Sequence, residues 1–400
     1  MLKILTVIGT RPEAIKLAPV VLELKRRPTE FLCLVCATGQ HRELLDQVLS
    51  VFGIVPDHDL DLMSHGQSLA QITARAVEGL DRIIALENPD VVLVQGDTTT
   101  AFCGALAAYY QKKKVGHVEA GLRTGNKFAP FPEEINRRLV GALTDYHFAP
   151  TDHARAALLS EGVLSSSVFV TGNTVIDALL WVRERVHREV PGLPAGLVKA
   201  IGGNQVILVT GHRRESFGDG FENICAAIRE VADASPNVLF IYPVHLNPNV
   251  QEPVNRILGG HARIRLIEPQ AYLPFVWLMD RASIVLTDSG GVQEEAPSLG
   301  KPVLVMRETT ERPEGIAAGN ARLVGVQKEK IAGELLRLLN HPEERLAMAA
   351  ARNPYGDGHA AGRIAETLLH GSQIANASGT TPGISTPESE LTVMKAQLHT

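Results

Sequence analysis

The sequence predicts an α/β protein made of two doubly wound, Rossmann-like domains that face a central cleft. Two observations support this fold class. Apolar, β-rich runs alternate with helical patterns along the whole chain, and the runs are continuously hydrophobic rather than alternating. Such runs are typical of parallel strands covered by helices on both faces. The chain has 400 residues, of which 45% are hydrophobic, so it can form two domains with separate cores.

The predicted strands fall into two series. The first series comprises residues 3–8, 32–37, 91–95, 115–118, 147–149 and 168–171. The second comprises residues 206–210, 238–243, 263–267, 284–287 and 302–306. We therefore expect an N-terminal domain over 1–172 and a C-terminal domain over 173–359, with a hinge near 172–177. The stretch 360–370 is the last strongly patterned helix, and the polar composition of 371–400 predicts a mobile tail.

Charge and hydropathy exclude several classes of protein. The net charge is −5, and the lysines and arginines are scattered rather than clustered, which argues against nucleic-acid binding. No segment approaches the roughly 18 unbroken apolar residues of a membrane-spanning helix. The apolar run at residues 2–8 is too short for a signal peptide. We therefore expect a cytoplasmic protein without membrane partners.

Two patterns resemble metal or redox motifs, and for each we favour another interpretation. Cys33 and Cys36 lie in an apolar run that predicts a buried strand, where residues three apart face opposite sides and cannot share a metal or a disulfide. Asp57-His58-Asp59 follows Pro56 without further ligands nearby, and we expect it to be a solvated turn. We predict no metal site.

Residues 284–295 carry the strongest functional signal. A short strand is followed by Asp288, Ser289, Gly290 and Gly291, and then by a helix. Bare N–H groups at a helix start suit a diphosphate, and the carboxylates at 294 and 295 suit the hydroxyls of a ribose. The alternative is an ordinary strand-to-helix turn rich in glycine.

In open α/β sheets, ligands bind beyond the carboxyl ends of the strands, so the polar residues that follow each strand are informative. Arg11 and Lys16 follow the first strand and can meet phosphate oxygens. Asp97, Glu119 and Glu133 follow later strands of the same domain, and together they form a plausible acid/base cluster in which like charges separate the pKa values. The alternatives are a solvated helix start for the cations, an N-cap for Asp97, and an ordinary first-turn acid for Glu133.

The second domain adds His212 after its first strand and His245 after its second. Arg312 lies in a charged segment after the last predicted strand. Histidines placed at the cleft edge of an α/β domain are good candidates for functional groups, although a structural role for His245 stays open.

These segments, in this order, resemble the non-hydrolysing UDP-N-acetylglucosamine 2-epimerases, and the resemblance runs from Gly9 to about residue 370. It is specific because many motifs recur together: GTRPEAIK at 9–16, TGQH at 38–41, QGDTT at 95–99, VEAGLRT at 118–124, FPEEINR at 131–137, GNTVID at 172–177, TGHRRE at 210–215, DSGGVQEEAP at 288–297 and RETTERPEG at 307–315. The resemblance implies a glycosyltransferase-B-like fold whose last helix crosses back to the first domain. It also implies reversible conversion of UDP-GlcNAc to UDP-ManNAc, a homodimer, and a role in supplying ManNAc-type sugars for surface polysaccharides.

The chemistry is consistent with that implication. The C2–H of a GlcNAc unit has no adjacent carbonyl, so direct deprotonation is too slow. Transient oxidation would need a nicotinamide coenzyme, but no GxGxxG fingerprint follows a predicted strand. Elimination of UDP instead gives 2-acetamidoglucal, and re-addition of UDP completes the epimerisation without a cofactor. This route needs a diphosphate clamp, carboxylates beside the sugar and a closed cleft.

The resemblance also implies roles for individual residues. The acid/base candidates are Asp97, Glu119 and Glu133, assisted by Lys16 and His212. The substrate and UDP contacts are Arg11, Arg137, His245, Tyr272, Ser289, Gly290, Gly291, Glu295 and Arg312. Parts of a possible activator site for a second UDP-GlcNAc are Gln40, His41, Gln67 and Arg213. One departure is Ala271, where relatives often carry an acidic residue, and it bears on uracil recognition near Tyr272.

Other functions stay open at this stage. A metal-independent UDP-sugar glycosyltransferase would share the fold and the nucleotide clamp. A 2-epimerase of a modified UDP-diacetamido sugar, or a hydrolysing epimerase that releases ManNAc and UDP, would share more of the site. A non-catalytic sugar-nucleotide sensor would keep the clamp but has no need of the three carboxylates.

Overall fold

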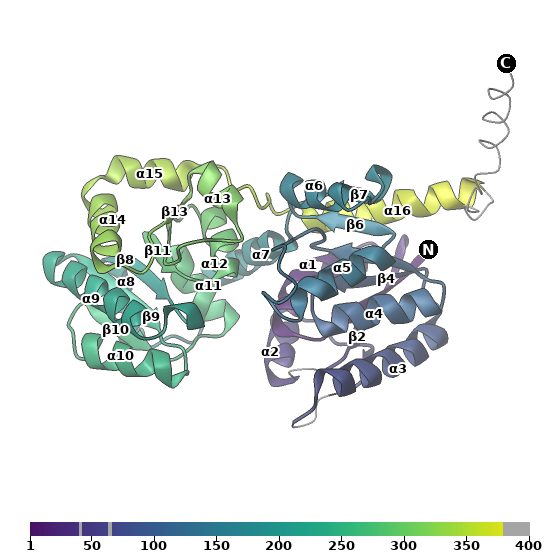
Figure 1. The fold of residues 1–400 in the computed structure, drawn as a ribbon, viewed down its shortest axis with the longest axis horizontal. Helices are drawn as coiled ribbons and strands as arrows, with labels where there is room; N and C mark the ends of the chain where they lie inside the picture. Colours follow the sequence, from purple (N-terminus) through teal and green to yellow (C-terminus); the bar gives the residue numbers. More distant parts are fainter. Residues whose placement is uncertain (40–41, 63–65, 379–400) are drawn as a thin grey trace, which may run out of the picture.

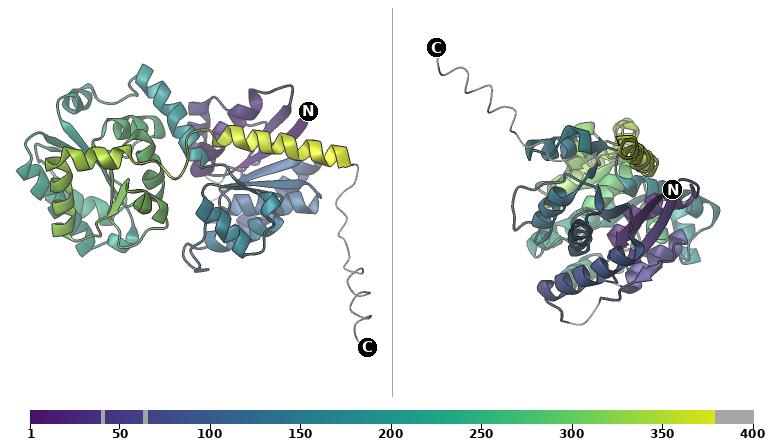
Figure 2. Two further views of the ribbon diagram at one scale, coloured as in Figure 1. Left: turned by 90° about the horizontal axis from the view of Figure 1, so that it is seen from above. Right: turned by 90° about the vertical axis from the view of Figure 1, so that its right-hand side faces the viewer.

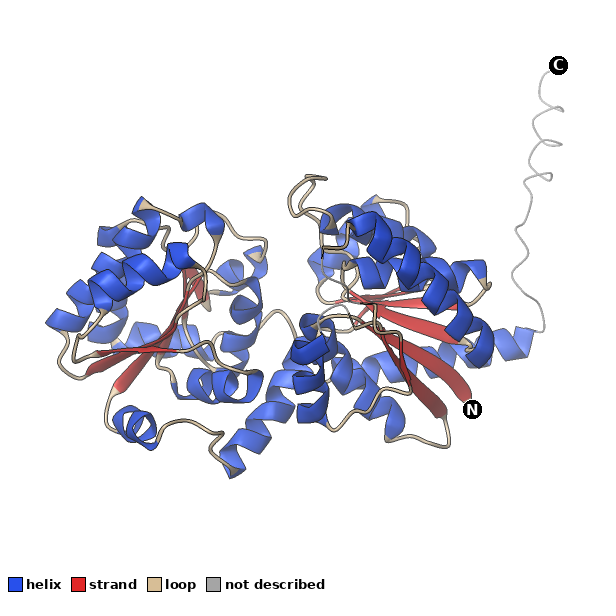
Figure 3. Ribbon diagram, turned by 90° about the horizontal axis from the view of Figure 1, so that it is seen from below, coloured by secondary structure: helices blue, strands red, loops and turns tan. Residues whose placement is uncertain are grey.

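The computed structural model describes residues 1–39, 42–62 and 66–378 and contains two sheets, each with helices on both faces (Figures 1 and 3). The first sheet has the order β3-β2-β1-β4-β5-β6-β7, with β1 (Leu2–Ile8), β2 (Phe31–Ala37), β3 (His58–Asp59), β4 (Val91–Gln95), β5 (Lys114–Val118), β6 (Tyr146–Ala149) and β7 (Val168–Val170). The second has the order β10-β9-β8-β11-β12-β13, with β8 (Gln205–Thr210), β9 (Val238–Pro243), β10 (Ile264–Ile267), β11 (Ile284–Thr287), β12 (Val303–Val305) and β13 (Ala321–Leu323). All neighbouring strands are parallel, which confirms the predicted fold class.

Two helical layers cover the first sheet. One face shares a core with α1 (Arg11–Lys25), α2 (Arg42–Phe52), α7 (Thr174–Arg188) and α16 (Ala360–Ser378). The other face packs against α3 (Leu69–Glu87), α4 (Thr99–Tyr110) and α5 (Glu133–Leu143). Helix α6 (Asp152–Ser160) contributes to a small, separate hydrophobic cluster. The 3-10 turn η1 (Ser165–Ser167) follows it in the chain. Because both faces are covered, the central strands are apolar on both sides.

The second sheet is covered in the same way. One face packs against α8 (Ala195–Gly202) and α11 (Tyr272–Arg281), in a core that continues into the first domain. The other face packs against α9 (Asp219–Ala234), α10 (Pro248–Leu258) and α14 (Lys328–Asn340). The shorter elements are η2 (Arg214–Ser216), α12 (Gly290–Glu295), η3 (Ala296–Leu299), α13 (Pro313–Ala318) and α15 (Pro342–Ala350). Among the described helices, none combines the length and the apolar character needed to cross a bilayer.

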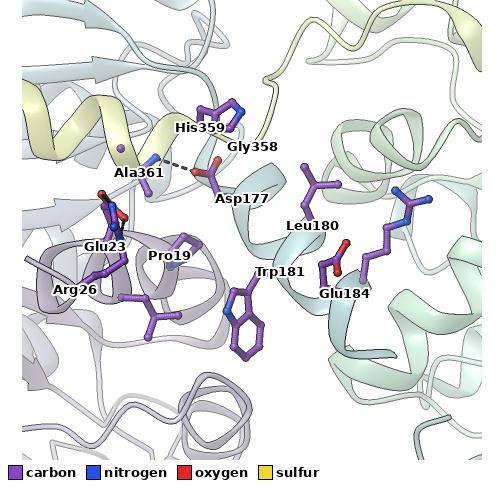
Figure 4. Close-up of a pocket in the computed structure, with 13 residues that line it drawn as sticks. Pro19, Glu23, Arg26, Asp177, Leu180, Trp181, Glu184, Gly358, His359 and Ala361 are labelled. Carbon is purple, nitrogen blue, oxygen red and sulfur yellow. Dashed lines mark hydrogen bonds and ion pairs between the residues drawn. The ribbon is translucent and has the colours of Figure 1, made fainter. Parts of the chain in front are cut away.

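The chain passes between the two lobes twice, and the two crossings are tied together. The first crossing leads into α7, and the second leads into α16, which lies along the first lobe (Figure 2). Asp177 on α7 accepts hydrogen bonds from the backbone N–H groups of Ala360 and Ala361, at 3.2 and 2.8 Å, and so caps α16. Behind this junction, α1, α7 and α16 line a groove of about 670 Å³ into which Trp181 projects (Figure 4).

The strand order places the functional loops. In each sheet, successive strands are added first toward one edge and then toward the other. The change of direction lies between β1 and β4 in the first sheet and between β8 and β11 in the second. Ligands of open α/β sheets bind at such switch points, beyond the carboxyl ends of the strands. The segments that leave these four strands begin at Gly9, Gly96, Gly211 and Asp288, and each belongs to a motif that the sequence analysis selected.

Three expectations about the elements were wrong. At Asp57-His58-Asp59 both aspartates are exposed, as expected, but the segment is not simply a turn: His58 and Asp59 pair with β2 as an edge strand, and the Asp57 carboxylate accepts the Val35 N–H at 2.8 Å. Strand β13 was not predicted, because it has three residues and contains Arg322. Helix α16 continues past residue 370 to Ser378, because Gly371 packs closely against the Tyr146 ring rather than ending the helix. The rest of the predicted tail, residues 379–400, lies outside the described residues.

The interpretation of the cysteines is confirmed. Cys33 and Cys36 are free thiols buried in different cores on the two faces of the first sheet. Cys103 and Cys225 are also free and buried. Burial raises the pKa of the Cys33 thiol to about 11 and that of Cys36 to about 12, so both remain protonated and pack as apolar groups.

Candidate active site

A cavity of about 600 Å³ lies between the domains, and we call it the interdomain cavity. The first domain contributes the start of α1, and the second contributes the loops after β8, β9, β10 and β11. The predicted site residues that line it are Arg11, Lys16, His212, His245, Tyr272, Ser289, Gly291, Glu295 and Arg312. Tertiary structure therefore brings most of the predicted UDP contacts into one site.

Lys16 and Glu119 form the central ion pair. Lys16 Nζ lies 2.6 Å from both carboxylate oxygens of Glu119, and the Glu119 side chain is only 5% exposed. Burial alone would raise the pKa of Glu119, but the attraction of Lys16 lowers it below its ordinary value. Burial alone would lower the pKa of Lys16, but Glu119 raises it. Both groups are therefore charged at neutral pH.

The backbone at Glu119 is unusual for a residue with a side chain. Glu119 follows β5 with a φ of 63°, in the left-handed region that glycine normally occupies. Gln95 at the end of β4 donates a hydrogen bond to its carboxylate. Strained backbone of this kind persists only where the surroundings hold it, and it concentrates at functional sites.

Asp97 and Glu133 line a second cavity, of about 290 Å³. Arg137 binds the Asp97 carboxylate through Nε at 2.8 Å and Nη2 at 2.6 Å. The N-cap of α4 is Thr98, whose side chain accepts the Ala101 N–H, so capping does not explain Asp97. Glu133 Oε2 is buried without a hydrogen-bond partner among the described residues. Buried polar atoms normally have a partner, which favours a ligand contact at Glu133.

The expected like-charge cluster is not what the structure shows. Glu119 pairs with Lys16, whereas Asp97 pairs with Arg137, and Glu119 lines neither cavity. The pKa of Glu119 is lowered by cations rather than raised by the other carboxylates. The expected effect of like charges on Glu119 was wrong, because spacing along the chain does not reveal which cation packs against which carboxylate. The three carboxylates stay acid/base candidates.

Arg312 connects the two cavities, since it lines both. Its Nε donates to Glu294 Oε1 at 2.7 Å. Gly290 lies beneath the guanidinium, where an added Cβ would come within 3.3 Å of Arg312 Cζ. A glycine at this position therefore leaves room for the arginine side chain. Arg312 is therefore placed to contact a single ligand that fills both cavities.

Tyr272 and Glu295 form the most buried polar pair of the interdomain cavity. Tyr272 donates its hydroxyl to Glu295 Oε1 at 2.9 Å. Burial raises the pKa of Glu295 to about 7, although the Tyr272 hydroxyl opposes the rise. Ala271, the departure from the family pattern, is the N-cap of α11 and makes no side-chain cap. Glu295 is a ready acceptor for ligand hydroxyls.

The two predicted histidines stack against each other. The rings of His212 and His245 have centroids 5.6 Å apart. His212 Nδ1 lies 3.1 Å from Asp288 Oδ1, and Asp288 Oδ2 accepts the backbone N–H groups of His212 and Arg213. The Asp288 carboxylate therefore orients the His212 ring at the end of β8.

Sequence reasoning missed Glu13. Thr10 and Glu13 form a capping box at the start of α1. Glu13 Oε1 also accepts the Thr98 hydroxyl at 2.6 Å, so this carboxylate joins the loop of Arg11 to the loop of Asp97. The Thr-x-x-Glu spacing is the signal that could have identified it. Gln95 and Asn173 were also missed as parts of the charged network, and Glu294, expected to suit a ribose, is bonded to Arg312 and Asn173 instead.

The structure tests the activator residues only in part. Gln40 and His41 lie outside the described residues. Gln67 directly precedes Ser68, the N-cap of α3, and lines neither cavity. Arg213 lines the second cavity, and its Nη1 lies 3.9 Å from Glu311 Oε1.

Known proteins are similar to this chain in sequence and in fold. The family model described as UDP-N-acetylglucosamine 2-epimerase matches residues 22–369. A UDP-N-acetylglucosamine 2-epimerase of Salmonella typhimurium is 59% identical over 371 residues, which is 92% of this chain and 98% of that protein. A putative epimerase of this name from Listeria monocytogenes has a solved structure with 49% identity and a TM-score of 0.87, covering 93% of this chain and 97% of the other. A UDP-GlcNAc 2-epimerase from Neisseria meningitidis, solved bound to UDP-GlcNAc, has 50% identity and a TM-score of 0.82, covering 92% and 100%.

Two Rossmann-like domains around a shared charged cavity define a protein of the glycosyltransferase-B-like class. Within that class, the chain belongs to the UDP-N-acetylglucosamine 2-epimerase family and is an epimerase.

Proposed function

We propose that the protein interconverts UDP-GlcNAc and UDP-ManNAc by eliminating UDP and adding it back. The observation that carries this proposal is the junction at Arg312. There a cavity suited to a nucleoside diphosphate meets a cavity lined by carboxylates. The relative from Neisseria meningitidis, which is 50% identical, was solved with UDP-GlcNAc bound.

The interdomain cavity would hold UDP. Arg11, Lys16 and Arg312 supply positive charge for the diphosphate, and the N–H groups of Gly290 and Gly291 begin α12 beside it. Glu295 would accept hydrogen bonds from the ribose, with Tyr272 beside it. His245 and His212 border the same space, where His212 can donate a proton to the departing phosphate.

The carboxylates would handle the hydrogen at C2. One of them removes the C2 proton, and the C2–H electron pair forms the C1=C2 double bond. The electron pair of the breaking C1–O bond leaves with UDP. The products are 2-acetamidoglucal and UDP, with no net change of oxidation state. A second acid delivers a proton to the opposite face of C2, and UDP adds back to C1. Asp97, Glu119 and Glu133 are the candidates, with Arg137 holding Asp97 in place.

The remaining expectations belong to this proposal. The protein would act in the cytoplasm as a homodimer and supply ManNAc-type sugars for surface polysaccharides. A second UDP-GlcNAc would activate it at a site that includes Gln40, His41, Gln67 and Arg213. Hyperbolic kinetics with UDP-ManNAc alone, without any trace of UDP-GlcNAc, would contradict the activation.

Proton NMR of UDP-GlcNAc incubated with the protein in D₂O tests the reaction. We expect deuterium at C2, formation of UDP-ManNAc without an acceptor, and a small amount of free UDP. A glycosyltransferase would leave UDP-GlcNAc unchanged without an acceptor, and a sensor would leave it unchanged in every condition. Retention of the original C2 hydrogen in the product, or a requirement for a nicotinamide coenzyme, would overturn the mechanism.

A further inference from the structure

The side chain of Asn173, at the first crossing between the domains, lies between a carboxylate from each domain. Its Nδ2 donates to Glu294 Oε2 at 3.0 Å and to Glu119 Oε1 at 3.5 Å. Its Oδ1 accepts the Val175 N–H at 3.1 Å and so caps α7. Asn173 is only 2% exposed. The amide has one favourable orientation, because a flip would direct Oδ1 at two carboxylates and Nδ2 at an N–H group.

The backbone around Asn173 connects the two crossings. The Asn173 N–H donates to the Tyr355 carbonyl at 2.7 Å, which places residue 173 beside the segment that leads into α16. The Tyr355 hydroxyl in turn donates to the Arg312 carbonyl and accepts the Gly315 N–H, each at 3.1 Å. The junction between the domains is therefore bonded to the loop that carries Arg312.

These contacts join the charged groups of the two domains in one series. Lys16 binds Glu119 in the first domain, and Arg312 binds Glu294 in the second. Asn173 is the only described residue whose side chain is hydrogen-bonded to both carboxylates. A neutral group with two donors suits this position, because an added anion would repel both carboxylates and an added cation would compete with Lys16 and Arg312.

We propose that Asn173 is a positioning residue that fixes the position of Glu119 relative to Glu294. Lys16 and Arg312, which pair with these carboxylates, then face the same bound sugar nucleotide. This role rests on the proposed function, because the relative position of the two carboxylates matters only if one ligand contacts both domains. Asn173 itself need not touch the ligand. Its effect is on the placement of charged groups, where an error of about 1 Å can reduce turnover about 100-fold.

Two substitutions separate this role from helix capping. Asn173→Ser and Asn173→Asp both keep an oxygen that can cap α7, but neither keeps the two N–H donors. We expect turnover of UDP-GlcNAc to fall about 10-fold or more in Asn173→Ser, with KM changed less than kcat and the pH profile unmoved. In Asn173→Asp we expect a larger fall, of about 100-fold.

The pH profile of turnover distinguishes the positioning role of Asn173 from a purely structural role. Glu119 is faced by Lys16 from α1, by Arg137 from α5, by Arg312, and by the neutral Gln95 from β4. A new carboxylate at 173 adds a negative charge beside Glu119, which favours the protonated form of Glu119. In a plot of turnover against pH, the rise on the acidic side should therefore move to higher pH in Asn173→Asp only. Asn88→Asp, which adds a carboxylate beside Lys113 at the end of α3, is the matched control.

Unfolding by urea without any ligand provides a second readout. As pH rises from 5 to 8, Asn173→Asp should lose stability relative to Asn173→Ser, because the buried carboxyl introduced at 173 must lose its proton beside two carboxylates. If the stability of the two variants depends equally on pH, or if both turn over within two-fold of the wild type, the positioning role of Asn173 is overturned. A wild-type protein that incorporates no deuterium from D₂O would contradict the proposed function alone, since the unfolding comparison needs no substrate.

Discussion

Lys16 and Glu119 are 103 positions apart in sequence, yet Lys16 Nζ lies 2.6 Å from both Glu119 carboxylate oxygens. The pair joins the start of α1 to the residue that follows β5. Both groups are largely withdrawn from water, so each relies on the other for its charge.

Replacing Lys16 by methionine should be costly for both stability and activity. The substitution leaves Glu119 buried without its main partner, which raises the pKa of that carboxyl and removes a cation from the diphosphate side. We expect a loss of about 3 kcal/mol in the free energy of unfolding and at least a 100-fold loss of turnover. Urea unfolding and the NMR assay measure the two effects. Lys25→Met, on an exposed position at the end of the same helix, should leave both within error.

Asp97→Asn and Glu119→Gln should each abolish turnover while UDP still binds. Both changes keep the shape of the side chain but remove its charge and its ability to take a proton. Calorimetry with UDP should give affinities within a few-fold of the wild type. Asp233→Asn, which removes an exposed carboxylate at the end of α9, is the control. Unchanged turnover in both active-site variants would refute their assignment as acid/base residues.

Glu13 should make stability depend on pH. Burial raises the pKa of Glu13 from 4.5 to about 7, although hydrogen bonds from Thr98, Thr10 and Gly9 oppose the rise. Because the folded pKa lies above the unfolded one, the stabilising contribution is complete below pH 4.5 and is lost as pH rises through 7. The loss corresponds to about 3 kcal/mol.

Glu13→Gln removes this titration, so wild type and variant provide the test. The stability of the wild type should decrease relative to Glu13→Gln between pH 5 and 8, as measured by urea unfolding. Glu295 titrates over a similar range in both proteins and cancels in the comparison. A constant difference across this range would show that Glu13 is not protonated in the folded protein.

Glu295→Gln should weaken UDP binding, because the proposed hydrogen bonds from the ribose hydroxyls lose a charged acceptor. A charged acceptor for a hydroxyl contributes about 1.5–3 kcal/mol, so we expect a loss of roughly 10- to 100-fold in affinity. The same substitution should remove the preference of the wild type for UDP over 2′-deoxy-UDP. Tyr272→Phe, which removes a donor to Glu295 but keeps the acceptor, should retain that preference. A preference that survives Glu295→Gln would place the ribose elsewhere.

The two series of parallel strands and the polar segments at their ends could be predicted from the amino-acid sequence alone. Continuous apolar runs and glycine-rich turns are local signals, and they were sufficient to select the loops that begin at Gly9, Gly96, Gly211 and Asp288. The motifs in these loops were also sufficient to indicate the family. Most of the predicted UDP contacts line one cavity because parallel sheets bring the carboxyl ends of their strands to one edge.

The partners of the buried charges could not be predicted in this way. The pairing of Lys16 with Glu119 and of Asp97 with Arg137 depends on how strands and helices distant in sequence pack together. The same holds for Asn173, whose two carboxylate partners come from different domains. Hydrophobic periodicity specifies which face of an element is buried, but the partner of a buried charge is set by packing between elements, and no local pattern encodes it.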